Sequence, residues 1–257
     1  MLLEDIDVAR EPFAKEERDM RKAIIIGVGP DRGLGAQLCK RFASEGLKVY
    51  VAGRTQATLE AVVAGIKSSG GEAVPVVADA TNEADIFSLF DQAGDGLELA
   101  IYNTGNNTPG RIVDMEASYF EQSWRTVCFG GFLFGREAVR RLLPSGGGSL
   151  LFTGASASLR GRSGYGAFNS SKAALRTLAQ AMAKEYAADG IHVGHVVVDG
   201  AIGGEKISRR LPDFANRLEQ GQLIEIEGIV EAFVFLHKQK RNAWSFEIDV
   251  RTSKESW

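Results

Sequence analysis

The fold of this 257-residue chain is decided by one stretch, KAIIIGVGPDRGLGAQLCKRFASEGLKVYVAGR, at residues 22–54. It begins with a β-branched apolar run at 23–26 and ends with a second apolar run at 49–52. Between them, leucine and phenylalanine recur at helical spacing until Gly46, which can end a helix. Short continuous apolar runs are typical of strands buried on both faces of a parallel sheet. The stretch therefore predicts strand, turn, helix and strand.

The turn between the first strand and the helix is rich in glycine. Gly29, Gly33 and Gly35 are spaced G-x-x-x-G-x-G. A phosphate group can reach the unpaired amides of a helix N-terminus only where no Cβ blocks the backbone. A glycine turn is often only a turn, but this one lies between a strand and a helix, with a second strand following. We therefore predict a dinucleotide site built on these three glycines and Leu34.

Two arginines refine the cofactor prediction. An NAD site usually has an acidic side chain at the end of the second strand, where it binds the ribose hydroxyls. Here Arg54 occupies that point, and Arg32 lies within the glycine turn. Guanidinium groups beside the adenosine ribose suit a 2′-phosphate, so we predict NADP(H) rather than NAD(H). The alternative is that both arginines are ordinary solvated surface residues.

Strands and helices alternate along the rest of the chain. Further strands are predicted at 73–78, 97–102, 149–153, 191–198 and 245–250. Helices are predicted at 56–69, 86–93, 118–143, from a cap at Asn169 or Ser170 to Gly190, and at 229–237. Pro75 cannot donate a ladder hydrogen bond, which favours a sheet edge or a strand start for the third strand. The order predicts an α/β fold, a Rossmann-type doubly wound parallel sheet flanked by helices, as a single domain over 22–257 after a charged arm at 1–21.

The helix predicted at 118–143 is long and apolar on one face, through Phe120, Trp124, Val127, Phe132 and Val139. Gly130 and Gly131 interrupt it. Glycine lowers helix propensity, so the pair indicates a place where another backbone or side chain packs closely against the helix.

Composition and charge exclude several classes of protein. The 30 basic and 33 acidic residues give a net charge of −3 and form no long basic run, which argues against nucleic-acid binding. Cys39 and Cys128 belong to no CxxC pair, and His192 and His195 point to opposite faces of their strand, so no metal site is predicted. No apolar run has the length of a signal peptide or a membrane span. The default expectation is a soluble cytoplasmic protein that does not bind membranes.

Polar residues follow the third and fourth strands. Asp79 comes after the strand at 73–78, and Asn103 and Gly105 come after the strand at 97–102. Ligands of such sheets bind outside the carboxyl ends of the strands, so these three residues are predicted to contact the cofactor. The alternatives are a turn or N-cap aspartate and an ordinary loop.

Taken in order, these motifs resemble the short-chain dehydrogenase/reductase (SDR) family over about residues 22–250. The residues that carry the resemblance are VGPDRGLG at 28–35, Asp79, NTG at 103–105 and SSKAAL at 170–175. The resemblance implies a Rossmann-type domain that binds a nicotinamide cofactor, with Lys172 and Ile202 among its contacts. It also implies a homodimer or homotetramer that pairs through the helix from Ser118 and the helix that carries Lys172.

In that family an Asn, a Ser and a Tyr-x-x-x-Lys carry out the chemistry. The tyrosine moves the proton, the serine binds the substrate oxygen, and the lysine lowers the tyrosine pKa and holds the nicotinamide ribose. Lys172 matches the lysine, whereas Phe168, Ala155 and Cys128 stand at the tyrosine, serine and asparagine positions. A general acid raises the reaction rate roughly 10²–10⁴-fold, and one oxyanion donor raises it about 10²–10³-fold. A tetrad that lacks both would therefore be expected to reduce ordinary carbonyl compounds very slowly.

Two nearby hydroxyl groups are candidate replacements. Tyr165 lies three residues before Phe168, and Ser156 follows Ala155 directly. The simpler interpretation of Tyr165 is a loop aromatic that packs on a neighbour.

Two functions fit the sequence. The first is an NADP(H)-dependent short-chain oxidoreductase that moves hydride between nicotinamide and a carbonyl or alcohol substrate in an atypical active site. The second is an NADP(H)-binding pseudoenzyme, a sensor, scaffold or hetero-oligomer partner without redox turnover, which Ala155 and Phe168 favour. Residues 200–223 are predicted to cover the small-molecule substrate, which the sequence does not identify.

Overall fold

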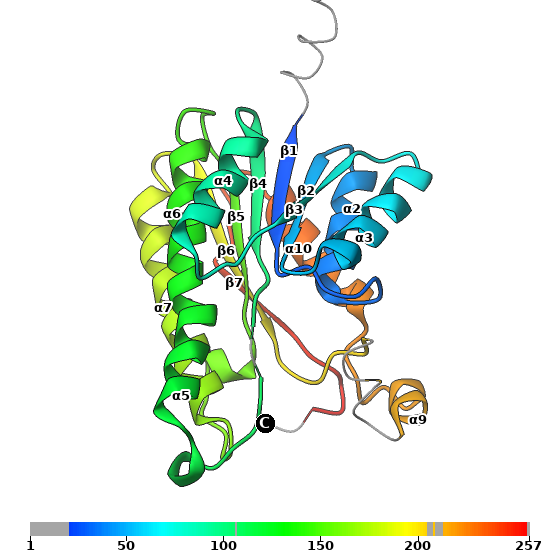
Figure 1. Ribbon diagram of the computed structural model, residues 1–257, viewed down its shortest axis with the longest axis vertical. Helices are drawn as coiled ribbons and strands as arrows, with labels where there is room; N and C mark the ends of the chain where they lie inside the picture. Colours follow the sequence, from blue (N-terminus) through cyan, green and yellow to red (C-terminus); the bar gives the residue numbers. More distant parts are fainter. Residues whose placement is uncertain (1–20, 106, 205–207, 209–212, 256–257) are drawn as a thin grey trace, which may run out of the picture.

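The computed structural model describes residues 21–105, 107–204, 208 and 213–255, which form a sheet with helices on both faces (Figure 1). The strands are β1 Lys22–Ile26, β2 Lys48–Gly53, β3 Ala73–Val77, β4 Leu97–Tyr102, β5 Gly148–Thr153, β6 Ile191–Val198 and β7 Glu247–Val250. The helices are α2 Leu34–Ser44, α3 Gln56–Ser68, α4 Glu83–Ala93, α5 Ala117–Trp124, α6 Gly130–Leu142, α7 Gly166–Tyr186, α9 Phe214–Glu219 and α10 Ile226–Lys238. Short 3₁₀ turns lie at Ile112–Asp114 and Ser156–Ser158.

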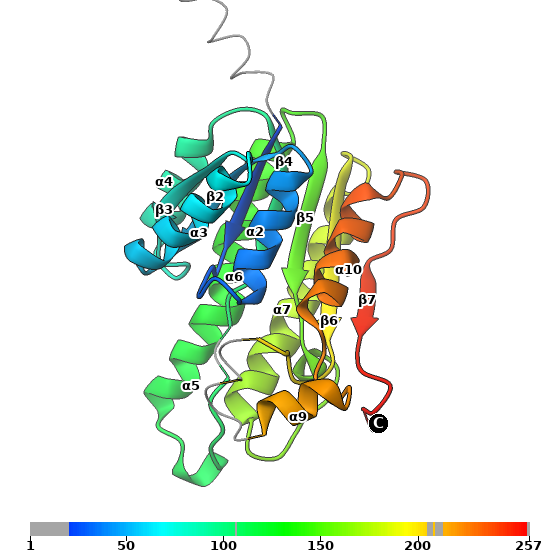
Figure 2. The same ribbon diagram turned by 90° about the vertical axis from the view of Figure 1, so that its right-hand side faces the viewer.

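All seven strands pair in parallel, in the order β3-β2-β1-β4-β5-β6-β7. The chain runs from β1 to one edge and then returns to β4, so the strand order reverses between β1 and β4 (Figure 2). In such sheets, ligands bind at this reversal, outside the carboxyl ends of the strands. The predicted Rossmann-type doubly wound sheet is therefore confirmed, and so is the edge position of the strand that contains Pro75.

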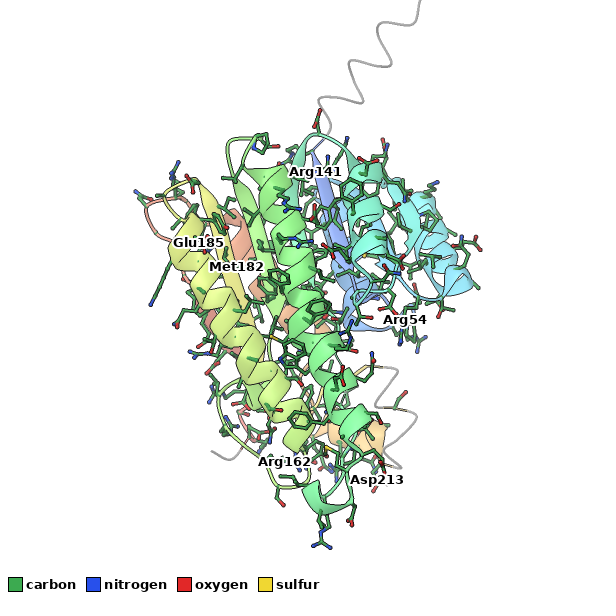
Figure 3. All side chains as sticks on the ribbon, turned by 60° about the vertical axis from the view of Figure 1, so that its left-hand side comes forward. Arg54, Arg141, Arg162, Met182, Glu185 and Asp213 are labelled. Atoms are coloured by element: carbon green, nitrogen blue, oxygen red, sulfur yellow. The ribbon has the colours of Figure 1, made fainter. Side chains whose placement is uncertain are left out.

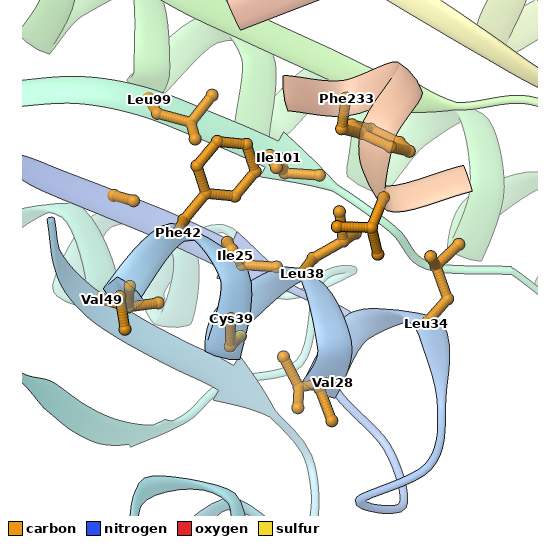
Figure 4. Close-up of a cluster of buried hydrophobic side chains, with 14 of the residues drawn as sticks. Ile25, Val28, Leu34, Leu38, Cys39, Phe42, Val49, Leu99, Ile101 and Phe233 are labelled. Atoms are coloured by element: carbon orange, nitrogen blue, oxygen red, sulfur yellow. The ribbon is translucent and has the colours of Figure 1, made fainter. Parts of the chain in front are cut away.

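The sheet separates two apolar cores. Ile25 of β1 faces the core beneath α2, α3 and α10, whereas its neighbours Ile24 and Ile26 face the core beneath α4, α6 and α7. In Figure 4, Phe42 of α2 and Phe233 of α10 lie over the first of these faces. The continuous β-branched run in β1 is thus required because both faces of the strand are buried.

The helix predicted at 118–143 is present, but a π-helical turn at Arg125–Phe129 joins α5 to α6. Gly130 and Gly131 do mark close packing, as predicted. A Cβ at Gly130 would lie 2.7 Å from the carbonyl oxygen of Ala80, and one at Gly131 would lie 2.5 Å from Leu175 Cδ1. These glycines let the long helix approach β4 and α7.

The predicted apolar face of that helix is only partly correct. Phe120, Trp124 and Phe132 do not pack into the core but are 44%, 40% and 38% exposed. Trp124 stacks on Phe129, and the Arg136 guanidinium lies 5.2 Å from the centroid of the Phe132 ring. The π-helical turn shifts the helical phase, so apolar residues on either side of it do not share one buried stripe.

Helix α7 begins at Gly166, so the predicted cap at Asn169 or Ser170 is wrong. The Ser170 hydroxyl instead donates to the Gly166 carbonyl oxygen within the helix. Residues 1–20 of the predicted arm, and 205–207 and 209–212 of the predicted covering segment, lie outside the described residues. In the described part of the chain, no helix is long and apolar enough to cross a membrane.

Candidate active site

The glycine turn leaves an open backbone surface at the carboxyl end of β1. Gly27 has a φ of +88°, and a Cβ there would lie 2.6 Å from the Asn103 carbonyl carbon. A Cβ at Gly35 would lie 2.9 Å from the Gly27 carbonyl oxygen. A Cβ at Gly29, by contrast, would meet no atom within 4 Å. Gly27 and Gly35 therefore close the turn, while Gly29 borders free space beside the N-terminus of α2, which Gly33 caps.

Arg32 and Arg54 are both exposed beside this space. Figure 3 labels Arg54, which follows β2 at the same end of the sheet. Asp31 is already paired with Lys40, at 2.6 Å between Oδ1 and Nζ. Within the described ranges, neither Arg32 nor Arg54 has an ion-pair partner, so both guanidinium groups are available to an anion.

The loop after β4 is tied to both neighbouring strands. Asn103 Nδ2 donates to the Gly27 carbonyl oxygen at 3.2 Å, and Asn103 Oδ1 accepts from the Thr153 hydroxyl at 2.9 Å. The Asn103 side chain thus fixes the glycine turn relative to the end of β5. Gly105, also predicted to contact the cofactor, lies beside Lys172, since a Cβ there would lie 3.8 Å from Lys172 Nζ.

Asp79 and Ile202 have structural contacts of their own. Asp79 Oδ1 accepts from the backbone amide and the hydroxyl of Thr81, both at 2.8 Å, which is a turn role. Ile202 forms a bridge with Ile224 and packs against the core beneath α10. The structure therefore supports the turn alternative for Asp79 and leaves cofactor contact by either residue as a prediction.

Lys172 is the most distinctive group at this end of the sheet. Its side chain is buried, and Nζ donates to the Thr153 carbonyl oxygen at 2.7 Å and to the Thr104 carbonyl oxygen at 3.4 Å. Burial lowers the pKa of Lys172 to about 8. The structure thus brings together Lys172, Asn103 and Gly105, which sequence reasoning placed in one site.

Phe168, Ala155 and Cys128 lie on three different elements. Phe168 lies one turn before Lys172 on the same face of α7 and is partly exposed. Ala155 follows β5 in an extended conformation, and its amide donates to the Ser158 hydroxyl at 3.1 Å. Cys128 lies in the π-helical turn, where partial burial raises the thiol pKa.

The two candidate replacement hydroxyls, those of Tyr165 and Ser156, lie in the segment between β5 and α7. Tyr165 is the N-cap residue of α7, seven residues before Lys172, which is about 10 Å along a helix axis. The Arg162 guanidinium lies 4.9 Å from the centroid of its ring, and the Tyr165 backbone bridges to Gly110. Ser156 begins the 3₁₀ turn after β5 and is partly exposed.

Sequence reasoning missed the groups that support Lys172. Thr153 supplies the closest acceptor for its ammonium group and also binds Asn103. The Thr126 carbonyl oxygen, in the π-helical turn, accepts from the Tyr102 hydroxyl at 2.6 Å and from the Thr104 hydroxyl at 3.1 Å. The role of Thr153 could not be predicted from the sequence, because a threonine in an apolar strand looks like any strand residue. The role of the Thr126 carbonyl oxygen could not be predicted either, because a π-helical turn has no simple sequence motif.

The two strand histidines, His192 and His195, make structural contacts. His195 Nδ1 contacts Glu247 Oε2 at 2.9 Å, and its Nε2 lies 3.5 Å from the Ser158 hydroxyl. Burial lowers the pKa of His195 to about 4. His192 stacks on Trp244 on the other face of β6. Both rings therefore help to attach β7 and its preceding loop to the sheet.

Comparison with known proteins agrees with this architecture. The family model described as short chain dehydrogenase matches residues 22–203. Versicolorin reductase stcU of Emericella nidulans is 30% identical over 188 residues, which cover 72% of this chain and 70% of that protein. The uncharacterized oxidoreductase YuxG of Bacillus subtilis is 27% identical over 208 residues, 79% of this chain, but the chain spans only 30% of that protein.

Solved structures show the same fold. A short-chain dehydrogenase from Rhodopseudomonas palustris is 34% identical, with a TM-score of 0.75 over 91% of this chain and 99% of that chain. A 7α-hydroxysteroid dehydrogenase complexed with NADH is 24% identical, with a TM-score of 0.80. The chain therefore belongs to the short-chain dehydrogenases, a family of oxidoreductases that use a nicotinamide cofactor.

Proposed function

We propose that this protein is an NADP(H)-dependent oxidoreductase that moves a hydride between nicotinamide and a small-molecule carbonyl or alcohol. The observation that carries the NADP(H) preference is the pair Arg32 and Arg54, exposed and without ion-pair partners in the described chain, beside the open surface at Gly29. A 2′-phosphate supplies the negative charge that two guanidinium groups would bind.

The residues at the sheet reversal fit such a cofactor. The amides at the start of α2 would bind phosphate where Gly29 leaves the backbone open. Two of the three Lys172 ammonium hydrogens have carbonyl acceptors, so the third can donate to a ribose hydroxyl. Asn103 bonds to Gly27 and to Thr153, and so fixes the distance between the glycine turn and the ammonium group of Lys172. The cofactor, when bound, supplies or accepts the hydride.

We also propose that Phe168, Ala155 and Cys128 occupy the positions where the family carries its catalytic tyrosine, serine and asparagine. The observation in favour is the position of Phe168, one turn before the buried Lys172 on the same helix face. The same observation favours the second candidate function, an NADP(H)-binding protein without redox turnover that acts as a sensor, scaffold or hetero-oligomer partner.

Calorimetric titration with NADPH and with NADH tests the cofactor proposal. Wild type should bind NADPH more tightly than NADH, and Arg54→Ala should weaken NADPH binding about 10–100-fold, the worth of one charge-assisted hydrogen bond. Arg140→Ala is the matched control, because Arg140 is exposed on α6 and pairs only with Glu137 among the described residues. Equal affinities for both nucleotides, or an Arg54→Ala variant that binds NADPH like wild type, would contradict the preference.

NADPH oxidation with ketones, aldehydes and quinones then separates the two functions. Turnover by wild type supports the oxidoreductase. Turnover only in the variant with Ala155→Ser and Phe168→Tyr supports the protein without redox turnover, because that variant restores a hydroxyl at each position. Measuring both proteins at saturating NADPH removes differences in cofactor affinity.

Assembly as a homodimer or homotetramer is part of the same proposal. The exposed aromatic side chains of Phe120, Trp124 and Phe132 on α5 and α6 lie on the surface that the family resemblance assigns to pairing.

A cytoplasmic location is also proposed, since Cys39 and Cys128 are free thiols, which suit a reducing compartment.

A further inference from the structure

The hydroxyl groups that surround Lys172 have their protons engaged. Three threonine and serine side chains next to it donate to fixed oxygen atoms. The bonds are Thr104 to the Thr126 carbonyl oxygen at 3.1 Å, Thr153 to Asn103 Oδ1 at 2.9 Å, and Ser171 to the Ala167 carbonyl oxygen at 2.6 Å. The nearby Ser158 hydroxyl accepts from the Ala155 amide. None of the first three hydroxyl groups can give a proton to a substrate without breaking a bond within the protein, and the Ser158 side chain is buried.

The side chains at the proposed tyrosine and serine positions are aromatic or apolar. Phe168 is one turn from Lys172 and partly exposed, and Ala155 presents only a methyl group. Neither the Phe168 nor the Ala155 side chain offers a donor to an oxygen atom that becomes negatively charged. The face of a phenylalanine ring does attract a cation. These two side chains therefore favour a substrate that begins positively charged and becomes neutral.

We propose that the acceptor reduced at this site is an iminium ion, a carbon–nitrogen double bond that carries its own positive charge. This inference rests on the proposed NADPH-dependent function and names its substrate class. In the reaction the iminium carbon takes up a hydride, the π electron pair of the C=N bond becomes the lone pair on nitrogen, and NADPH is oxidised to NADP⁺. No proton is transferred, so Phe168 and Ala155 need supply none.

Charge development distinguishes this substrate from a ketone. A ketone that accepts hydride becomes an alkoxide, and loss of the acid and of one oxyanion donor would each cost roughly 10²-fold or more. An iminium ion loses its charge in the same step, so neither loss applies. A quinone also becomes an oxyanion when it accepts hydride, so its reduction should be slowed in the same way as that of a ketone.

The ammonium group of Lys172 does not prevent a cation from binding nearby. Its Nζ faces the Thr153 and Thr104 carbonyl oxygens, which carry partial negative charge. Phe168 is one turn closer to the start of α7, roughly 6 Å away along that helix face. Burial also lowers the Lys172 pKa to about 8, so the positive charge is weakened in mildly alkaline solution.

The first measurement is binding, which needs no turnover. N-methyl-3,4-dihydroisoquinolinium is titrated calorimetrically into the NADP⁺-loaded protein, beside the neutral ketone 1-tetralone of similar size. The cation should bind at least 3-fold more tightly than the ketone, and Phe168→Leu should weaken cation binding about 3–30-fold. The matched control is Phe87→Leu, because Phe87 is also a solvent-accessible helix residue but lies on α4. Equal binding of cation and ketone, or equal effects of the two variants, would overturn the inference.

The second measurement is NADPH oxidation, corrected for the rate without protein. Wild type should reduce the iminium ion at least 100-fold faster than 1-tetralone. Tyr165→Phe and Ser156→Ala should keep more than one third of that rate, because no proton donor is needed. A tenfold loss in either variant, equal rates for ketone and iminium ion, or turnover of menadione alone would overturn the inference.

Failure of the proposed function is distinguishable from failure of this inference. A protein that binds neither NADPH nor NADH overturns both. A protein that binds NADPH tightly and reduces ketones but not the iminium ion overturns only the substrate class. Tight NADPH binding with no turnover of any acceptor also overturns the inference, and then supports the protein without redox turnover.

Discussion

Substituting Gly29 by alanine should separate nucleotide binding from folding. The added methyl group meets no protein atom within 4 Å, and Gly29 does not have a positive φ. In the free protein the change should therefore be neutral or stabilise by about 0.4–1 kcal/mol, because alanine restricts the unfolded chain. In the complex with the proposed cofactor, the same methyl group would occupy the space that a phosphate needs in order to reach the amides of α2.

The size of the binding defect follows from the hydrogen bonds that are lost. A bond between an amide and a charged phosphate is worth about 1.5–3 kcal/mol, so losing two costs roughly 3–6 kcal/mol. At 1.4 kcal/mol for each factor of ten, NADPH should bind about 10²–10⁴-fold more weakly. Calorimetry gives the affinity, and thermal unfolding of the free protein gives the stability.

Gly27→Ala is the contrasting variant. Gly27 has a φ of +88°, and the new Cβ would lie 2.6 Å from the Asn103 carbonyl carbon, so this variant should lose several kcal/mol of stability. If Gly29→Ala instead bound NADPH within threefold of wild type, the open turn could not be the phosphate site. If Gly29→Ala unfolded as readily as Gly27→Ala, the assignment of free space at Gly29 would be wrong.

Three further predictions concern packing, charge and assembly. Gly130→Ala should destabilise the protein by about 1–3 kcal/mol, since its methyl group would lie 2.7 Å from a carbonyl oxygen. Gly65→Ala, in the last turn of α3, would meet only a flexible lysine carbon at 3.8 Å and should stabilise the protein by about 0.5–1 kcal/mol in chemical denaturation. Burial lowers the Lys172 pKa to about 8, below its value in the unfolded chain, so the unfolded chain binds more protons above that pH. The stability of wild type relative to Lys172→Met should therefore rise between pH 8 and pH 10, and a flat difference would contradict the buried ammonium group. Trp124→Glu should shift sedimentation towards the monomer, because it puts a charge on the aromatic surface of α5; unchanged assembly would exclude that surface from the interface.

The sequence predicted those features that depend on local pattern and chain order. The β-branched run of β1, the glycine turn and the alternation of strands and helices were enough to predict the parallel sheet and its reversal. Pro75 placed its strand at an edge for a physical reason that holds in any sheet. Asn103 and Gly105 were assigned to this end of the sheet because ligands bind outside the carboxyl ends of parallel strands. Lys172, which lies on α7, was added through the family resemblance, and the structure places it beside Gly105.

The features that were not predicted depend on tertiary contacts. Nothing in the residues near Cys128 signals a π-helical turn, and that turn decides which aromatic side chains of α5 and α6 are exposed. The start of α7 was predicted too late because Ser170 resembles a cap, whereas its hydroxyl is satisfied within the helix. The role of Thr153 depends on its carbonyl oxygen and its hydroxyl together, and only the fold places both beside Lys172.

Pro75 also limits how these molecules can associate. At the two ends of β3, the Glu72 carbonyl and the Ala78 amide both bond to β2. The backbone groups of even-numbered residues therefore point towards β2. Those of the odd-numbered residues Ala73, Pro75 and Val77 point to the open edge of the sheet. The central position of that outer row has no N–H. A strand from another molecule would therefore find a gap in the middle of the edge that it has to extend. This edge of the sheet resists the strand-to-strand growth that leads to aggregates.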